Sequence, residues 1–97
     1  MTGWLASGLR RDVCIAVSGL ESPSDREIKK EIEERYGKNI PPRRFYGALE
    51  ELEKDGYLRR EVEGIHDRFS LTEPGARALE AQFEWFAERM DGSGNTG

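Results

Sequence analysis

The sequence predicts a mainly α-helical domain with a small β-hairpin, of the α+β class. In most of the chain, apolar residues recur at steps of three and four, which is typical of helices with one buried face. Between residues 57 and 71 the apolar stretches become short and alternate around a glycine-containing turn, which is typical of a hairpin. With 97 residues, the chain has room for one domain with a single modest core.

Residues 1–7 carry Trp4 and Leu5 but no sustained period, so we expect an N-terminal arm. Apolar positions at helical spacing predict a first helix from about Gly8 to Gly19, which the following Glu-Ser-Pro stretch ends. Cys14 is expected on the apolar side of this helix. We interpret it as a small core residue, with a redox-sensing thiol as the alternative.

A second helix is expected to start at Ser24, because the four residues Ser24 to Glu27 have the pattern of a capping box. Gly37 is its expected C-terminal stop. Prolines in the short turn that follows cannot continue a helix, but Pro42 suits the first position of a third one. We expect this third helix to end near Asp55.

Two short stretches, Tyr57 to Glu63 and Phe69 to Leu71, predict the strands of the hairpin, joined by a turn over residues 64–67. Thr72 is the expected N-cap of a last helix that runs to about Met90.

The order helix, helix, turn, helix, hairpin, helix predicts a winged helix-turn-helix over residues 8–72. Residues 73–91 then form an added C-terminal helix, which we assign to dimerisation, and residues 92–97 a disordered tail. In this fold the third helix enters the major groove of duplex DNA, and the hairpin, called the wing, lies along the phosphate backbone.

Charge is segregated along the chain, although the net charge is −4. Four basic residues and no acids lie between Arg35 and Leu49, which gives this stretch a charge of +4. Residues 73–91 contain five acids and two arginines, a charge of −3. One part of the molecule can therefore attract phosphates while another repels them.

The third helix carries the most informative candidates for DNA binding. Its apolar stripe leaves Arg43 and Arg44 pointing outward near its start, where a recognition helix meets base edges and an arginine can pair with guanine. Gly47 lowers helix stability, which indicates close approach of a phosphate or of another helix. The wing is a second basic element. The predicted DNA-binding residues are Lys38, Arg43, Arg44, Tyr46, Gly47, Arg59, Arg60, His66 and Arg68.

The last helix carries an apolar seam that suits pairing between two subunits. From Ala76 to Met90 its positions follow steps of three, four, three and four, as in a heptad repeat. The alternative is a helix packed back on its own domain. The predicted dimerisation residues are Trp4, Leu5, Ala76, Leu79, Phe83, Trp85, Phe86 and Met90.

No arrangement of residues predicts catalysis, so we do not expect an enzyme. His66 and Cys14, the only histidine and cysteine, lie on different elements and cannot build a zinc site. A phosphate-binding glycine loop and a paired nucleophile and base are also missing, so we expect no cofactor and no small-molecule ligand. We expect no contact with a membrane and a cytoplasmic location, because the sequence has neither a long apolar run nor a signal peptide.

Between residues 44 and 79, several short motifs follow one another in a fixed order: Phe45-Tyr46, Leu49, Leu52, Gly56-Tyr57-Leu58, Phe69-Ser70-Leu71-Thr72, Gly75 and Leu79. In this order the stretch resembles the PadR-like transcriptional regulators, in particular the short forms of halophilic archaea. The resemblance implies a homodimer that is held by its C-terminal helix, binds a pseudo-palindromic operator and acts as a repressor.

We therefore expect a sequence-specific transcriptional regulator that binds double-stranded DNA as a homodimer. The alternative is a winged-helix protein–protein interaction module within a larger assembly, whose third helix meets an acidic protein surface.

Overall fold

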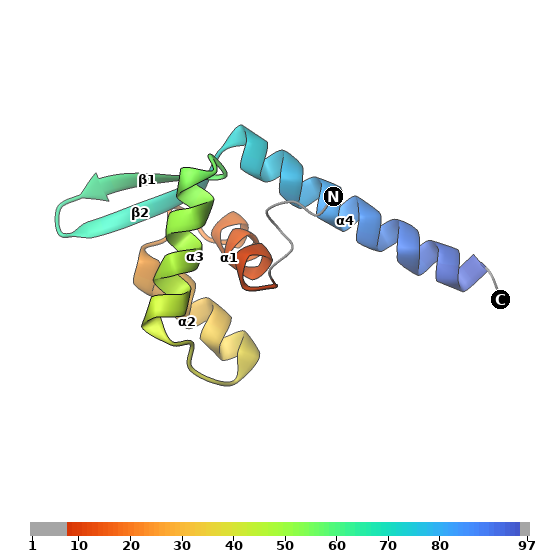
Figure 1. The fold of residues 1–97 in the computed structure, drawn as a ribbon, viewed down its shortest axis with the longest axis horizontal. Coiled ribbons are helices and arrows are strands. Elements are labelled where there is room, and N and C mark those ends of the chain that lie inside the picture. The colour runs from red at the N-terminus through yellow and green to blue at the C-terminus, as the bar shows by residue number, and fades with distance from the viewer. Residues whose placement is uncertain (1–7, 96–97) are drawn as a thin grey trace.

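The computed structural model of the chain describes residues 8–95, in the predicted order of elements (Figure 1). The predicted arm, with Trp4 and Leu5, lies outside the described residues. The elements are α1 (Gly8–Gly19), α2 (Asp25–Tyr36), α3 (Pro42–Lys54), β1 (Leu58–Glu63), β2 (His66–Leu71) and α4 (Glu73–Asn95). The mainly α-helical class with one small hairpin is thereby confirmed.

The start and the end of α2 follow from its sequence. The amide of Glu27 donates to the Ser24 hydroxyl at 3.2 Å, and the Glu27 carboxylate accepts the Ser24 amide at 2.8 Å. This pair is the predicted capping box. Gly37 ends the helix with a φ of 74°, a left-handed conformation that glycine adopts at little cost, and its amide donates to the carbonyl of Glu33.

The turn between α2 and α3 is closed by a side chain of α2. The Glu33 carboxylate accepts the amide of Ile40 at 2.8 Å and the ammonium of Lys29 at 2.6 Å. The side chain of Ile40 is buried in the core, so its amide and its side chain both hold the turn in place. Pro42 then opens α3 as predicted, because a proline at the first helical position loses no intrahelical hydrogen bond.

The hairpin is antiparallel, with Leu58 opposite Leu71 at its base and Glu63 opposite His66 at its outer end. The connection has only two residues, Gly64 and Ile65, where the sequence predicted four. His66 and Asp67 belong to β2. A two-residue connection needs a positive φ at its first position, and Gly64 supplies one of 64°.

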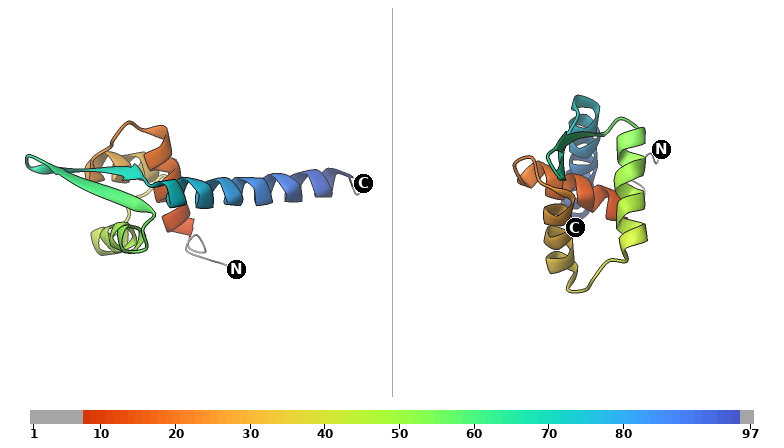
Figure 2. Two further views of the ribbon diagram at one scale, coloured as in Figure 1. Left: turned by 90° about the horizontal axis from the view of Figure 1, so that it is seen from above. Right: turned by 90° about the vertical axis from the view of Figure 1, so that its left-hand side faces the viewer.

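The hairpin is attached to the helices mainly at its base. Leu58 and Phe69 are buried in the core, and the amide of Phe69 donates to the carbonyl of Pro23, ahead of α2, at 2.9 Å. Every other residue of β1 is exposed. The outer half of the hairpin therefore projects from the body (Figure 2).

The core lies where α1, α2 and α3 meet the base of the hairpin. Cys14 is fully buried there, and burial raises the pKa of its thiol to about 12. Such a thiol carries almost no thiolate at neutral pH, as suits a packing residue. The buried apolar residues are Leu9, Val13, Cys14, Ala16, Val17, Ile28, Ile32, Ile40, Phe45, Ala48, Leu49, Leu52, Leu58, Phe69 and Leu79.

The first turn of α4 is fixed by Thr72. Its hydroxyl accepts the amide of Gly75 at 3.1 Å, which makes it the predicted N-cap, and it donates to the carbonyl of Gly56 at 2.6 Å. The helix then leaves the body on the side away from the wing, in a molecule of 54 × 30 × 22 Å (Figures 1 and 2).

The helix α4 continues to Asn95, whereas the sequence predicted its end at residue 91 and a disordered tail from residue 92. No proline interrupts this stretch, and each residue added to an existing helix forms one further backbone hydrogen bond. Glycine and serine therefore lower the stability of the last turn without ending the helix. Among the described residues, no helix is long and apolar enough to cross a membrane.

Candidate nucleic-acid interface

The start of α3 presents the cations that the sequence predicted. Arg43 and Arg44 are both exposed, and neither makes an ion pair with any described residue. Lys38, in the turn before the helix, is exposed as well. Because no acid lies in this part of the sequence, these cations keep their charge available for a ligand.

Packing of the opposite side of α3 holds these arginines outward. Phe45, Ala48, Leu49 and Leu52 are all buried, and they form one stripe at helical spacing. The arginines precede this stripe and lie on the exposed side. The same periodicity that builds the core thus determines which side chains a duplex could reach.

Tyr46 lies at the edge of this surface and is 42% exposed. Its hydroxyl donates to the carboxylate of Asp25 at 2.7 Å, and this hydrogen bond raises the pKa of Tyr46. Its ring meets the buried Phe45 edge-on, at 5.1 Å between centroids. Tyr46 therefore connects the start of α2 to α3 and remains partly accessible.

Gly47 faces open space. A Cβ atom built on it would find nothing within 4 Å, so among the described residues no other helix approaches it. Of the two explanations that the sequence offered for this glycine, the described residues do not supply the second, a neighbouring helix.

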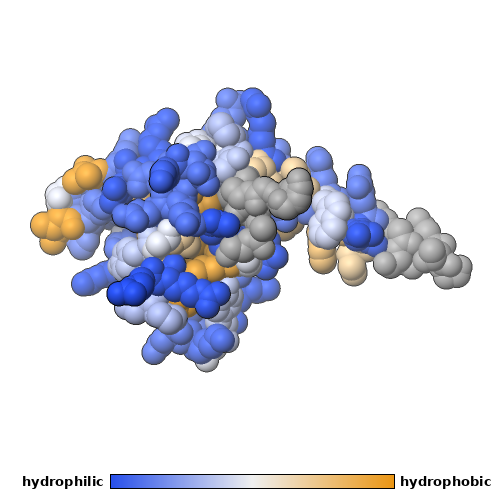
Figure 3. Space-filling model, viewed as in Figure 1, coloured by the Kyte–Doolittle hydropathy of each residue, from blue (hydrophilic) through white to orange (hydrophobic). Residues whose placement is uncertain are grey.

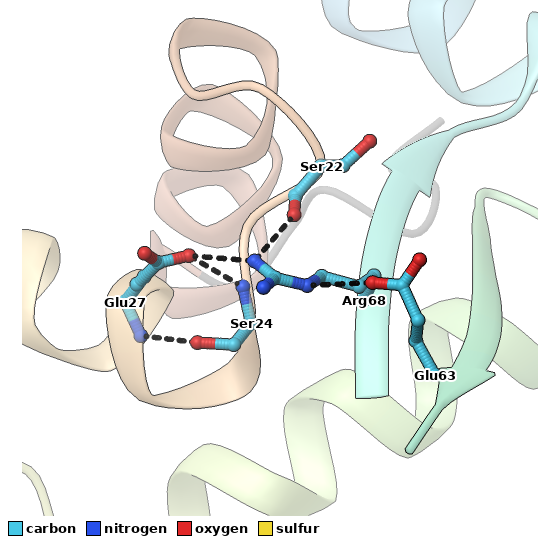
Figure 4. Close-up of polar contacts among 5 residues, drawn as sticks. All are labelled: Ser22, Ser24, Glu27, Glu63 and Arg68. Carbon is cyan, nitrogen blue, oxygen red and sulfur yellow. Dashed lines mark hydrogen bonds and ion pairs between the residues drawn. The ribbon is translucent and has the colours of Figure 1, made fainter. Parts of the chain in front are cut away.

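Two of the predicted wing residues are held by carboxylates. Arg60 pairs with Glu53 of α3 at 3.3 Å and with Asp67 of β2 at 3.2 Å. These carboxylates, Glu53 first, raise the pKa of Arg60. Arg68 pairs with Glu27 and with Glu63, each at 3.4 Å, and donates to the carbonyl of Ser22 at 3.2 Å (Figure 4).

The outer end of the wing is less basic than the sequence indicated. His66 at the outer end and Arg59 next to the base are exposed, but so are Val62, at 77%, and Ile65, at 93%. Figure 3 shows the resulting apolar area at the tip of the hairpin. Sequence reasoning placed Ile65 in the turn at the wing tip but did not include it or Val62 among the predicted binding residues.

The apolar seam of α4 divides into a buried and an exposed part. Leu79 belongs to the core, and Ala76 is half-buried. Phe83, Phe86 and Met90 are each more than half exposed. Figure 3 shows apolar side chains along one side of the projecting helix.

Trp85, off the seam, is 56% exposed and lies under the guanidinium of Arg89, 5.1 Å from the ring centroid. A groove of about 300 Å³ runs between α4 and the half-exposed Ile15 of α1, with Phe83 and Phe86 in its wall. The alternative of a helix packed back on its own domain thus applies only to the first turns of α4.

Within residues 8–95, no cluster of histidine, cysteine and carboxylate side chains has the geometry to hold a metal ion.

The fold is shared with several solved structures, although no family model matches the chain and no curated protein matches its sequence. RosR from H. salinarum superposes with a TM-score of 0.80 at 24% identity, over 86% of this chain and 76% of that one. PadR from Bacillus subtilis, solved in complex with operator DNA, superposes with a TM-score of 0.65 at 18% identity. That match covers 79% of this chain and 48% of PadR. The chain has the fold of RosR and PadR.

A protein of Archaeoglobus fulgidus, AF1382, superposes over 92% of this chain and 94% of its own, with a TM-score of 0.68 at 15% identity. The match thus spans nearly all of both chains.

Proposed function

We propose that this protein is a transcriptional regulator that binds double-stranded DNA in a sequence-specific manner. The observation that carries the proposal is the start of α3, where Arg43 and Arg44 are exposed, unpaired with described carboxylates, and placed at the end of the helix that reads DNA in this fold. An exposed cation with no neighbouring acid binds a polyanion most favourably, because no carboxylate has to be displaced when a phosphate or a guanine binds.

The comparisons support a nucleic-acid ligand over a protein one. PadR, which has the same fold, was solved in complex with operator DNA. An acidic protein surface could also neutralise Arg43 and Arg44. One helical turn further on, Gly47 faces open space, where a backbone phosphate or a base edge could approach closely.

We propose further that the protein acts as a homodimer through α4. Three large apolar side chains at seam positions, Phe83, Phe86 and Met90, are more than half exposed on a helix that leaves the body. Exposed apolar residues gathered on one helix are typical of an interaction surface. The groove beside Ile15 offers a place for apolar side chains of a second copy.

A symmetric dimer would bring two copies of α3 to successive major grooves, and its operator would therefore be pseudo-palindromic. A dimer seated on such a site near a promoter would exclude other proteins from the same DNA. This is the basis on which we propose repression.

The test starts from duplexes selected by the protein from a random pool. Binding of a selected duplex is titrated at several salt concentrations with the wild-type chain and with Arg43→Ala/Arg44→Ala. We expect the double variant to lose specific binding. Any residual binding should have a log–log salt slope flatter by about 0.9 for each phosphate contact removed.

Arg77→Ala is the matched control, because Arg77 is an exposed arginine on α4, remote from α3, and its loss changes the charge in the same direction. It should bind DNA like the wild type. Circular dichroism checks that all variants are folded. Unchanged binding by the α3 variant would remove α3 from the interface, and wild-type binding that ignores salt would favour the protein-interaction module.

A further inference from the structure

We propose that Arg68 and Arg60 position the wing for DNA and do not themselves bind phosphates. The proposal rests on the proposed DNA binding and concerns how the wing takes part in it. Both arginines are on the hairpin, and each connects it to one of the two helices of the helix-turn-helix unit.

Arg68 ties the wing to the start of α2. Its guanidinium donates to the Ser22 carbonyl at 3.2 Å and to the Glu27 carboxylate at 3.4 Å, while its Nε faces Glu63 of β1 at 3.4 Å (Figure 4). The Glu27 oxygen that receives Arg68 also accepts the capping hydrogen bond of Ser24. The contact therefore joins the hairpin to the cap of α2, more than forty residues earlier in the sequence.

Arg60 makes the corresponding connection to α3. Its guanidinium lies between Glu53, near the end of α3, and Asp67 on the neighbouring strand. One end of this bridge is thus on the recognition helix and the other on the wing. Together the two arginines hold the hairpin in a defined orientation relative to both helices.

Charge argues against phosphate binding by these two residues. Each guanidinium has two carboxylates within 3.4 Å, so each cluster carries a net charge of −1. A phosphate that approached Arg68 would be repelled by Glu27 and Glu63 and would have to displace them. Arg43 and Arg44 face no such competition.

The outer wing needs these bridges because it has no apolar anchor. Beyond Leu58 every residue of β1 is exposed, and in β2 only Phe69 is buried. Partly exposed ion pairs are individually weak, and removing one shifts an equilibrium by about two- to fivefold. That range is large enough to change how often the wing has the orientation that DNA requires.

The test compares Arg68→Gln, Glu27→Gln and the double variant, with Arg77→Gln as control. Glutamine at position 27 still suits a capping box, so α2 should keep its start while the ion pair is lost. If Arg68 positions the wing, both single variants should weaken binding of a selected duplex about two- to fivefold, with the salt slope unchanged. The double variant should be no weaker than the weaker single variant.

The opposite assignment gives a different pattern. If Arg68 binds a phosphate, Arg68→Gln should flatten the salt slope by about 0.9, and Glu27→Gln should strengthen binding because it removes a negative charge beside the DNA. That pattern, or single variants that bind like the wild type, would overturn the proposal.

A second measurement needs no DNA. The Phe69 amide donates to the Pro23 carbonyl, across the junction between the wing and the segment ahead of α2, so its hydrogen exchange reports the attachment. We expect faster exchange at Phe69 in Arg68→Gln and Glu27→Gln, and no change in Arg77→Gln. Unchanged exchange would overturn the attachment itself, whereas a wild-type chain that binds no duplex would instead remove the proposed function.

Discussion

Two helical glycines, Gly47 and Gly75, occupy opposite environments. A Cβ atom on Gly75 would lie 2.1 Å from the carbonyl oxygen of Tyr57, so the first turn of α4 packs directly on the backbone ahead of β1. A Cβ atom on Gly47 would meet nothing within 4 Å. Gly75 is therefore required by the fold. Gly47 lowers the stability of α3, and no contact among the described residues requires a glycine there.

Alanine at these two positions should consequently have opposite effects on stability. Gly75→Ala should lower the free energy of unfolding by about 1–3 kcal/mol, since the backbone has to shift. Gly47→Ala should raise it by about 0.5–1 kcal/mol, and should nevertheless weaken DNA binding if the duplex approaches there. Urea denaturation and duplex titration measure the two effects. A Gly47→Ala variant that is more stable and binds DNA normally would show that no duplex comes close to this glycine.

At the scale of residues, signals between close neighbours in sequence could be predicted, and contacts between distant residues could not. The capping box of Ser24 and Glu27 spans three residues, and its pattern is visible in the sequence. The partners of Arg68, by contrast, include Glu27, 41 residues away. The sequence therefore showed that Arg68 is basic, but not that folding brings a carboxylate to it.

Among the elements, the turn of the helix-turn-helix unit depends on Glu33. The hydrogen bond from Lys29, followed by the one from the Ile40 amide, lowers the pKa of Glu33 below its ordinary value of 4.5. Because the folded state favours the carboxylate, the stabilisation is complete above pH 4.5 and is lost as the pH falls through the lower folded value.

We therefore expect Glu33→Gln to be less stable than the wild type at neutral pH, with a difference that shrinks as the pH falls below about 4.5. Urea midpoints measured across this range test the expectation. Glu34→Gln is the control, because Glu34 lies on the same helix as Glu33 but makes no ion pair with any described residue. If the Glu33 difference stayed constant with pH, the carboxylate would not be what holds the turn.

The helices and strands could be predicted from the periodicity of apolar residues. Their ends could be predicted only where a specific residue marks them. Gly37 and Pro42 fixed the turn between α2 and α3 in the sequence and in the structure. The hairpin turn was predicted too long, because His66 and Asp67 are polar and the pairing that draws them into β2 depends on Glu63 and Val62 across the hairpin. Cross-strand pairing of this kind has no signal within one strand.

On the scale of the whole molecule, the exposed part of α4 is an apolar surface that no other described residue of the chain covers. Phe83 and Phe86 are each more than half exposed, so changing them should leave the fold intact. In sedimentation velocity we expect the wild type to be a dimer, as proposed, and Phe83→Glu/Phe86→Glu to be a folded monomer, because burying four like charges in one seam is unfavourable.

Val62→Glu provides the control for that experiment, since it places an acid on another exposed apolar residue, on the wing and away from α4. It should remain a dimer. A dimer that persists in the double variant would show that the subunits meet elsewhere.

The position of α1 between the other helices has a consequence for the approach to DNA. This helix packs against α3 on one side and α4 on the other, so the cationic start of α3 and the acidic α4 lie at separate ends of the molecule (Figure 2). Such a molecule has an electric dipole moment, and the field of a duplex exerts a torque that turns its cationic end forward during diffusion. Collisions would then occur more often with α3 leading, despite an overall charge of −4.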